Sequence, residues 1–348
     1  MSPITYTFFA MSLGLGTAVT FASSHWLWAW IGLEINTLAI LPMMKWMPHP
    51  RPVEATLKYF LVQITAAILI LFGALANALA TGQWHIMEMK DPYSTTFILL
   101  ALAYKMGLAP LHTWMPEVIQ GLDLTTGMIM NTWQKMAPFA LMYQMGNQPS
   151  TLLVWLGIIS IFIGAWGGLN QTQTRKIMAY SSVAHLGWLV IVLQFNPSLA
   201  VLAFGVYIAM TTTTFLILIR NQSTTLTALS SSWVENSVFA SVAMTVFLSL
   251  GGLPPLTGFM PKLLILYELT NQNYLIIAGV IAVTSLLALG YYLQIGFMMI
   301  LTMSPQTSSS PTHWRHEDKR KLAPLAILVV VSTMLLPLTP ALMPLLSM

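Results

Sequence analysis

Long runs of apolar residues follow one another along nearly the whole chain, with only short polar connections between them. A helix needs about 20 apolar residues, rising about 1.5 Å each, to cross the hydrocarbon core of a membrane. The runs are continuous and lack the period-two alternation of membrane strands, so they favour helices over a β-barrel. We predict eleven spans, at residues 3–22, 25–44, 56–80, 96–114, 122–144, 151–169, 175–194, 198–219, 236–268, 274–301 and 322–345. The pattern therefore predicts an all-α polytopic membrane protein with about eleven transmembrane helices and no separate soluble domain.

Composition agrees with this pattern and excludes several classes of protein. Of the 348 residues, 56% are hydrophobic and only 7% are charged, whereas soluble domains carry roughly 25% charged residues. A soluble enzyme and a disordered regulator are excluded, and a net charge of only +4 does not indicate a nucleic-acid partner. The chain has no cysteine, which removes disulfides, cysteine-bound zinc and cysteine-held iron–sulfur clusters. The start MSPITYTFFAMSLGLG has no basic n-region, so we expect it to be the first span rather than a cleaved signal.

The basic residues of the connections lie almost entirely on one side of the membrane, if successive spans alternate in direction. The side of the N-terminus holds ten of them: Lys45, Arg51, Lys58, Arg175, Lys176, Arg220, Arg315, Lys319, Arg320 and Lys321. The opposite side holds only Lys90. Because positive residues are enriched in cytoplasmic connections, we expect the N-terminus on the cytoplasm-like side. After an odd number of spans, the C-terminus is expected on the other side.

Four charged residues lie in the interior of the predicted spans, away from their ends: Glu34, Lys105, Lys135 and Lys262. A charge at the middle of a bilayer costs about 2.5–3.5 kcal/mol on insertion scales, so such residues usually face protein, a partner charge or a hydrated cavity. Buried ion pairs that only lock helices together are one interpretation, but one acid cannot neutralise three bases. Since buried lysines can exchange protons near neutral pH, we interpret the set as a path for protons.

Glu34 and Lys105 are the natural ion pair among the four residues, and a neighbouring event can switch the charge state of this pair.

The helix around Lys135 is expected to be irregular. Lys135 precedes Pro138 by three residues. Because Pro138 cannot donate a hydrogen bond to the carbonyl of residue 134, the helix is expected to loosen beside the lysine. Loosened backbone inside a membrane must line a cavity or be covered by protein.

Two proline-rich segments resemble each other and predict an internal repeat. Residues 108–117 read LAPLHTWMPE and residues 253–262 read LPPLTGFMPK, with five identities in ten positions. They fall at helix breaks in the fourth and ninth spans; five spans separate them, so the copies have opposite orientations. Chance similarity between proline-rich helix ends is the alternative. We predict one membrane domain of two inverted five-helix repeats with discontinuous helices, at 1–145 and 150–301, plus a C-terminal helix at 322–345; such repeats place ion sites near the midplane.

Other candidates are weaker. His112 follows the break in the fourth span and either relays protons or only caps freed backbone. His185, in the seventh span, either links the two half-paths or packs as a hydrogen-bonded histidine. Glu268 belongs to the path or to the surface. The charged segment 313–321 is a candidate contact for an anionic lipid.

Four motifs carry a resemblance to a known family. They are AWIGLEINTLAILP, ALAYKMGLAPLHTWMPEVIQGL, NQTQTRKIMAYSSVAHLGW and LSLGGLPPLTGFMPKLLIL. With these motifs the chain resembles, over nearly its whole length, the antiporter-like subunits of respiratory complex I. Members with fourteen helices have three more at the N-terminus, so this chain is expected to start at the helix equivalent to their fourth. The long lateral helix of the most distal member has no counterpart in the sequence.

The resemblance implies a core membrane-arm subunit of NADH:ubiquinone oxidoreductase, a translocase, that moves protons while other subunits oxidise NADH and reduce quinone. By motif, Glu34 resembles the glutamate that pairs with the lysine of the first broken helix, Lys105. Lys135 resembles the central lysine, and Lys262 resembles the lysine of the second broken helix. His185 occupies a polar position of the axis that links them.

The resemblance also implies the cofactors, the partners and the cellular location of the chain. It implies no cofactor on this chain and NADH, FMN, iron–sulfur clusters and ubiquinone elsewhere in the complex. Expected partners are other core membrane-arm subunits, including neighbouring antiporter-like subunits, together with accessory subunits and a phospholipid such as cardiolipin. The expected location is the mitochondrial inner membrane, with the N-terminus in the matrix and the C-terminus in the intermembrane space. Two alternatives stay open: a cation/proton antiporter subunit, and a membrane scaffold that relays charge only sideways.

Overall fold

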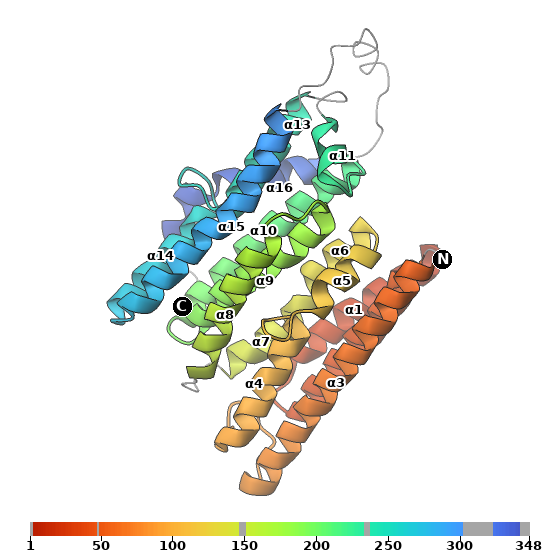
Figure 1. Ribbon diagram of the computed structural model, residues 1–348. Helices are drawn as coiled ribbons and strands as arrows, with labels where there is room; N and C mark the ends of the chain where they lie inside the picture. The colour runs from red at the N-terminus through yellow and green to blue at the C-terminus, as the bar shows by residue number, and fades with distance from the viewer. Residues whose placement is uncertain (1–2, 47–48, 146–150, 233–236, 302–322, 342–348) are drawn as a thin grey trace. The chain divides into compact units, whose positions relative to one another are not determined.

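The computed structural model describes residues 3–46, 49–145, 151–232, 237–301 and 323–341. Within these ranges the ordered elements are helices, and β-type pairing is limited to two isolated bridges. The chain divides into two compact units, Met1–Ser160 and Ile161–Met348 (Figure 1). The all-α fold with several apolar helices is as predicted.

The first unit holds helices α1 to α7 and the start of α8. Their bounds are α1 Pro3–Ala22, α2 Trp26–Met44, α3 Pro50–Thr81, α4 Pro92–Met106, α5 Trp114–Gly121, α6 Leu124–Asn131, the 3-10 turn η1 Trp133–Lys135 and α7 Met136–Gln144. Helix α1 packs along α2, and α3 packs along α5. Helix α3 also packs along α4 (Figure 1). Gly16 and Gly32 permit the first of these contacts, because a Cβ on Gly16 would stand 2.9 Å from the Gly32 carbonyl oxygen.

Local sequence sets where several of these helices begin. The side chains of His25, His49 and Asp91 accept backbone hydrogen bonds at the N-termini of α2, α3 and α4. A proline follows His49 and another follows Asp91. Proline suits the first turn, since the amide hydrogen that it lacks has no partner there. Helix α3 therefore begins at Pro50, before the predicted start of its span at residue 56.

The second unit begins within α8 (Thr151–Gly168). It continues with α9 Thr174–Leu193, α10 Pro197–Arg220, the short α11 Leu226–Ser230, α13 Ser237–Gly251, α14 Phe259–Asn271, α15 Leu275–Leu301, α16 Ala323–Met334 and the 3-10 turn η3 Leu336–Leu338. Helix α10 packs against α9, α13 and α16, and α13 packs along α15. Among the long helices of this unit, α9 has the most deeply buried span.

The breaks predicted in the fourth and ninth spans are present and have the same construction. Helices α4 and α13 end 145 residues apart, and α5 and α14 begin 145 residues apart (251 − 106 and 259 − 114). Gly107 and Gly252 follow the first half-helix of each break, with φ angles of 77° and 81°. Only glycine adopts this left-handed conformation without steric cost. The glycine pair extends the matched segments by one position, in register.

The fifth span is also interrupted, whereas the sequence predicted one loosened helix. Helix α6 ends at Asn131, and the 3-10 turn η1 precedes the restart of the helix at Met136. Pro138 then falls in the first turn of α7, where its missing amide hydrogen leaves no bond unmade. The loosening predicted from Pro138 thus takes the form of a complete restart, directly at Lys135.

Seven helices of the described ranges are long and apolar enough to cross a membrane alone: α1, α2, α3, α8, α9, α10 and α15. Three further predicted spans are covered in pieces, by α4 with α5, by α6 with α7, and by α13 with α14. The last predicted span is represented by α16, and its final residues lie outside the described ranges. Arg315, Lys319, Arg320, Lys321 and the predicted lipid contact 313–321 also lie outside them, and the number of eleven spans stays a prediction.

The two isolated bridges occupy corresponding places in the two units. His25, the N-cap of α2, pairs with His85, which follows α3. Gln173, the N-cap of α9, pairs with Thr225, which follows α10. In each unit the bridge ties the start of the second helix to the segment after the third.

Candidate functional site

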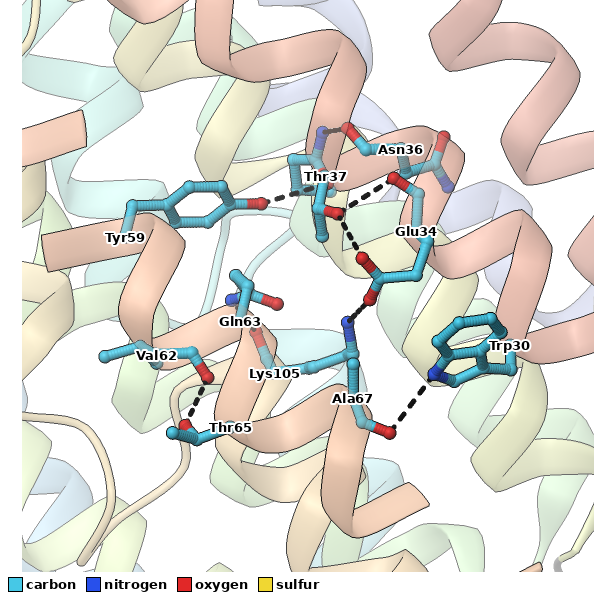
Figure 2. Close-up of polar contacts among 11 residues, drawn as sticks. Trp30, Glu34, Asn36, Thr37, Tyr59, Val62, Gln63, Thr65, Ala67 and Lys105 are labelled. Atoms are coloured by element: carbon cyan, nitrogen blue, oxygen red, sulfur yellow. Dashed lines mark hydrogen bonds and ion pairs between the residues drawn. The ribbon is translucent and has the colours of Figure 1, made fainter. Parts of the chain in front are cut away.

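Glu34 and Lys105 come together inside the first unit. Glu34 lies in α2 and Lys105 in the last turn of α4, and Lys105 Nζ is 3.8 Å from Glu34 Oε1 (Figure 2). The lysine side chain is 1% exposed and the glutamate side chain 22%. The ion pair expected from the sequence is therefore present.

Neighbouring helices hold the two charges in place (Figure 2). Thr37 Oγ1 donates a hydrogen bond to Glu34 Oε2 at 3.4 Å. The indole of Trp30 donates to a carbonyl of α3 at 3.2 Å, which ties α2 to α3. Gln63 Nε2 donates to the carbonyl of Lys105 at 3.5 Å, which ties α3 to α4. The pair is thus positioned by three helices.

The end of α4 provides a second reason for the place of Lys105. Its ammonium is carried by the last turn of the helix, where unpaired carbonyls give a partial negative charge that favours a cation. Gly107 ends the helix with a positive φ, and a Cβ there would lie 2.9 Å from the sulfur of Met115. The break therefore requires glycine both for backbone conformation and for space.

A small cavity lies between Lys105 and Lys135. Its volume of about 10 Å³ is enough for about one water molecule. Uncharged polar side chains line it beside the two lysines: Asn36, Thr37, Tyr59, Gln63 and Gln134. The side-chain amide of Asn36 and Nε1 of Trp114 are buried with no hydrogen-bond partner among the described residues. Since buried polar groups are normally satisfied by protein or ordered water, this cavity is suited to hydration.

Lys135 closes the turn η1 and is 2% exposed. The preceding residue, Gln134, holds the turn from two sides. Its Nε2 donates to the carbonyl of Asn36 in α2 at 3.3 Å. Its Oε1 accepts from the hydroxyl of Tyr59 in α3 at 3.5 Å. These contacts place Lys135 on the same cavity as Lys105.

The uncharged residues of this cavity were missed by reasoning from charge. Tyr59 and Gln63 are four residues apart in an apolar stretch of α3, so they share one face of the helix. Asn36 follows Glu34 by two residues, and Gln134 directly precedes Lys135. A search for uncharged polar side chains at helical spacing within the spans would have found them.

In the second unit, Lys262 lies near the start of the half-helix α14, and its ammonium reaches the end of the half-helix α13. Its Nζ donates a hydrogen bond to the carbonyl of Gly251, the last residue of α13, at 2.8 Å. The C-terminal end of a helix carries a partial negative charge that favours a cation. A Cβ on Gly252 would lie 2.9 Å from Lys262 Nζ. Glycine at 252 therefore allows the ammonium to approach the freed carbonyl.

The weaker candidates lie at three different places. His112 lies in the link between α4 and α5, and its imidazole contacts the backbone of Pro110. His185 lies in α9, with its ring centroid 5.7 Å from that of Tyr207. Glu268 is three residues from the end of α14, where its Oε1 accepts from the Gln272 amide at 3.3 Å. Each of the three is partly exposed rather than fully buried.

The candidate residues therefore form two groups. The first unit brings Lys105 and Lys135 onto one small polar cavity, and Glu34 lies 3.8 Å from Lys105. The second unit carries Lys262 on a helix break and His185 in the buried helix α9. Ammonium groups beside a carboxylate, a helix terminus and a cavity of this size are suited to holding and releasing protons.

Comparisons with known proteins agree along the whole chain. The family model for the transmembrane part of NADH:quinone oxidoreductase/Mrp antiporters matches residues 23–288. The model for the C-terminus of NADH dehydrogenase subunit 2 matches residues 289–343. NADH-ubiquinone oxidoreductase chain 2 of Salmo salar is 53% identical over 349 residues, and that of Gadus morhua is 53% identical over 348 residues. Both alignments cover 100% of this chain and 100% of the relative.

Solved structures show the same architecture. A chain of respiratory complex I from Thermus thermophilus, determined with bound aureothin, matches with a TM-score of 0.86 and 25% identity. The match covers 99% of this chain and 80% of that chain. A chain of the Mrp complex from Dietzia sp. DQ12-45-1b matches with a TM-score of 0.82 and 18% identity, over 96% of this chain and 75% of that chain. The second match is a likeness of fold alone.

Proposed function

Since the chain belongs to the family of NADH-ubiquinone oxidoreductase chain 2, we propose that it is a core membrane-arm subunit of respiratory complex I that translocates protons. The observation that carries the proposal is the place of three lysines, each at an interruption of a membrane helix: Lys105, Lys135 and Lys262. A permanent charge there is costly, whereas a lysine beside polar, freed backbone can take up and release a proton. Redox chemistry in other subunits drives the movement.

Each residue has a distinct role in this proposal. Glu34 and Lys105 form a switchable ion pair, because their separation of 3.8 Å leaves a contact that opens easily. Lys135 is the central proton-holding site on the shared cavity. Lys262 controls proton entry or exit at one end of the path. His112 supports the first break through its contact with the backbone, and is available as a relay.

The same proposal extends to the surroundings of the chain. The subunit lies in the mitochondrial inner membrane, with its N-terminus in the matrix and its C-terminus in the intermembrane space. It contacts neighbouring antiporter-like subunits, accessory subunits and anionic phospholipid. NADH, FMN, the iron–sulfur clusters and ubiquinone are bound by other subunits. The ten-to-one distribution of basic residues between the two sides supports the orientation.

We also propose that the two units are inverted repeats. The matched breaks and the corresponding bridges support this relation. The bridge at His85 follows the third span and the bridge at Thr225 follows the eighth, so an odd number of spans separates them. If the spans alternate in direction, the two bridges face opposite sides of the membrane.

Single cysteines should show this sidedness, because the chain has no cysteine of its own. Gln83→Cys and Thr227→Cys each place a thiol on an exposed residue next to one bridge. In sealed inner-membrane vesicles, a membrane-impermeant maleimide should label the two positions from opposite sides. Met87→Cys, in the same connection as Gln83, should label from the same side as Gln83→Cys. Labelling of Gln83→Cys and Thr227→Cys from one side would contradict the inverted repeat.

Substitution of Lys262 by arginine tests the proposed function directly. Arginine keeps the positive charge near the Gly251 carbonyl but does not release its proton in proteins. The Lys262→Arg variant should therefore assemble, while NADH oxidation and proton translocation slow together by about tenfold or more. Both rates are measured in reconstituted vesicles with a pH-sensitive dye and with NADH absorbance.

The exposed residue Lys45 supplies the matched control, because Lys45→Arg makes the same change outside the breaks. It should leave both rates unchanged. Normal turnover with full translocation in Lys262→Arg would show that Lys262 does not need to deprotonate. Lys262 would then be a fixed charge that holds α14 in place.

A further inference from the structure

A cluster of hydroxyl groups lies buried in the second unit, in helices that cross the membrane, and has no role in the path of charged residues. Its members come from three helices: Ser181 and Ser182 on α9, Tyr207 on α10, and Tyr291 and Tyr292 on α15. The two serines are 0% exposed and the three tyrosines 1%. Polar groups at such depth are expensive unless they are hydrogen-bonded. Their concentration in one place therefore indicates a function.

The hydroxyl groups of the three tyrosines lie near one another and near the two serines. Each serine donates a hydrogen bond to a carbonyl of its own helix, Ser181 to Met178 at 2.8 Å and Ser182 to Ala179 at 2.6 Å, and its oxygen can still accept one. The Tyr207 hydroxyl approaches Ser182 and interacts electrostatically with Tyr292. The Tyr292 hydroxyl approaches Ser181 and Tyr291, and the two tyrosine rings are 4.4 Å apart. Neither the Tyr291 nor the Tyr292 hydroxyl makes a hydrogen bond of normal geometry within the described ranges. Both therefore keep capacity to donate to, and accept from, an intervening water molecule.

The cluster reaches an ionisable residue at each end. At one end, Tyr292 packs on Gly251, where a Cβ would lie 3.5 Å from Tyr292 Cβ and Cδ2. The carbonyl of Gly251 is the group that holds the Lys262 ammonium at 2.8 Å. At the other end, the ring centroid of Tyr207 is 5.7 Å from that of His185. Residues of the cluster thus contact both His185 and the residue whose carbonyl holds the Lys262 ammonium.

The cluster occupies the place that the ion pair has in the first unit. Glu34 lies nine residues after the N-cap of α2, and Ser182 lies nine residues after the N-cap of α9 (34 − 25 and 182 − 173). Tyr59 lies close enough to Glu34 to interact electrostatically, as Tyr207 lies beside Ser182. The second unit therefore has a hydroxyl where the first has a carboxylate.

We propose that Tyr207, Tyr291 and Tyr292, with Ser181 and Ser182, form a hydroxyl relay that carries protons between His185 and Lys262. This inference rests on the proposed function and extends it to uncharged groups.

In each transfer, a hydroxyl oxygen accepts a proton from one neighbour and releases its own hydrogen to the next, so one O–H bond forms for each that breaks. The ammonium of Lys262 gives up an N–H proton and the imidazole nitrogen of His185 takes one up, or the reverse. No charge remains on the hydroxyl groups after a passage. A relay of this kind requires no carboxylate in the second unit.

Tyrosine-to-phenylalanine substitutions test the relay, because they remove the hydroxyl oxygen and keep the ring. Tyr292→Phe and Tyr207→Phe should each slow proton translocation by the assembled complex by about tenfold or more. They should also increase the solvent deuterium isotope effect on turnover, which a purely structural role would leave unchanged. Tyr267→Phe is the matched control on an exposed residue of α14, and it should behave as wild type.

A serine variant tests the relay in case a phenylalanine variant assembles poorly. Ser181→Ala removes another hydroxyl of the relay with little change in volume and should give the same slowing. Wild-type rates and isotope effects in Tyr292→Phe, Tyr207→Phe and Ser181→Ala would overturn the relay.

A Lys262→Met variant measured in parallel separates the relay from the proposed function of the subunit. Translocation lost only in Lys262→Met refutes the relay alone, and translocation retained in Lys262→Met refutes the proposed function as well.

Discussion

Proton translocation should fall by about 100-fold when Lys135 is replaced by methionine, which is the lower end of what a positioned proton-transfer group contributes. Methionine keeps a flexible apolar stem of similar length but has no group that can hold a proton. Lys135 is 2% exposed on the turn η1, so its ammonium is surrounded by protein rather than by bulk water. Losing the charge removes a desolvation penalty. The Lys135→Met variant should therefore assemble at a near-normal level.

The measurement is the number of protons moved per NADH oxidised, in vesicles that hold equal amounts of assembled complex. Lys90→Met makes the same substitution on an exposed connection and should keep the wild-type ratio. If Lys135→Met also keeps the wild-type ratio and rate, Lys135 is not the central site. Loss of assembly in Lys135→Met, with Lys90→Met intact, would assign Lys135 to structure instead.

Breaking the pair of Glu34 and Lys105 should have the second large effect. Removal of one partner from a buried ion pair costs about 3–5 kcal/mol because the other charge stays uncompensated. Glu34 is 22% exposed, so solvent screening places the expected cost toward the lower end of this range. Glu34→Gln and Lys105→Met should each impair coupling between NADH oxidation and translocation. The double variant should be no worse than the more severe single variant.

A double-mutant cycle on the coupled rate measures this relation. The control pair is Glu54 and Lys58, which are 2.8 Å apart with side chains 66% and 42% exposed. Exposed pairs of this kind contribute about 0–1 kcal/mol, so Glu54→Gln and Lys58→Met should have small effects. Additive losses in the Glu34 and Lys105 cycle would show that the two residues act independently.

Most of the helical layout could be read from the sequence, because the signals for it are local. Apolar run length decides whether a segment spans a membrane, and the glycine and proline pattern marks where a helix stops. The predicted breaks in the fourth and ninth spans are present for this reason. The interruption of the fifth span at Lys135 was predicted only as a loosened helix. Whether a chain bends or restarts beside Pro138 depends on tertiary contacts, here the hydrogen bonds of Gln134 to α2 and α3.

The charged part of the candidate site was also accessible from the sequence, because a charge within an apolar run is conspicuous. Four such residues are evident in the printed chain, and the single acid among them has few possible partners. The uncharged part was less conspicuous. The spacing of Tyr59 and Gln63 marks them as candidates, but neither their spacing nor that of the tyrosine pair at 291–292 shows which helix faces they meet. Only the packed helices bring Tyr59 and Gln63 to the cavity that Lys105 and Lys135 share.

The sequence by itself therefore determined that this is a membrane protein, where its spans lie approximately, which orientation is expected and which charged residues lie within the spans. Each of these follows from the transfer of side chains between water and lipid, which depends on composition and short-range order. The tertiary structure decided which carbonyl holds Lys262, which cavity Lys105 shares with Lys135, and which tyrosine packs beside His185. These depend on contacts between helices far apart in the chain, where differences of a few ångströms decide whether a proton can pass. No local pattern of residues encodes such distances, because they are set by how whole helices pack.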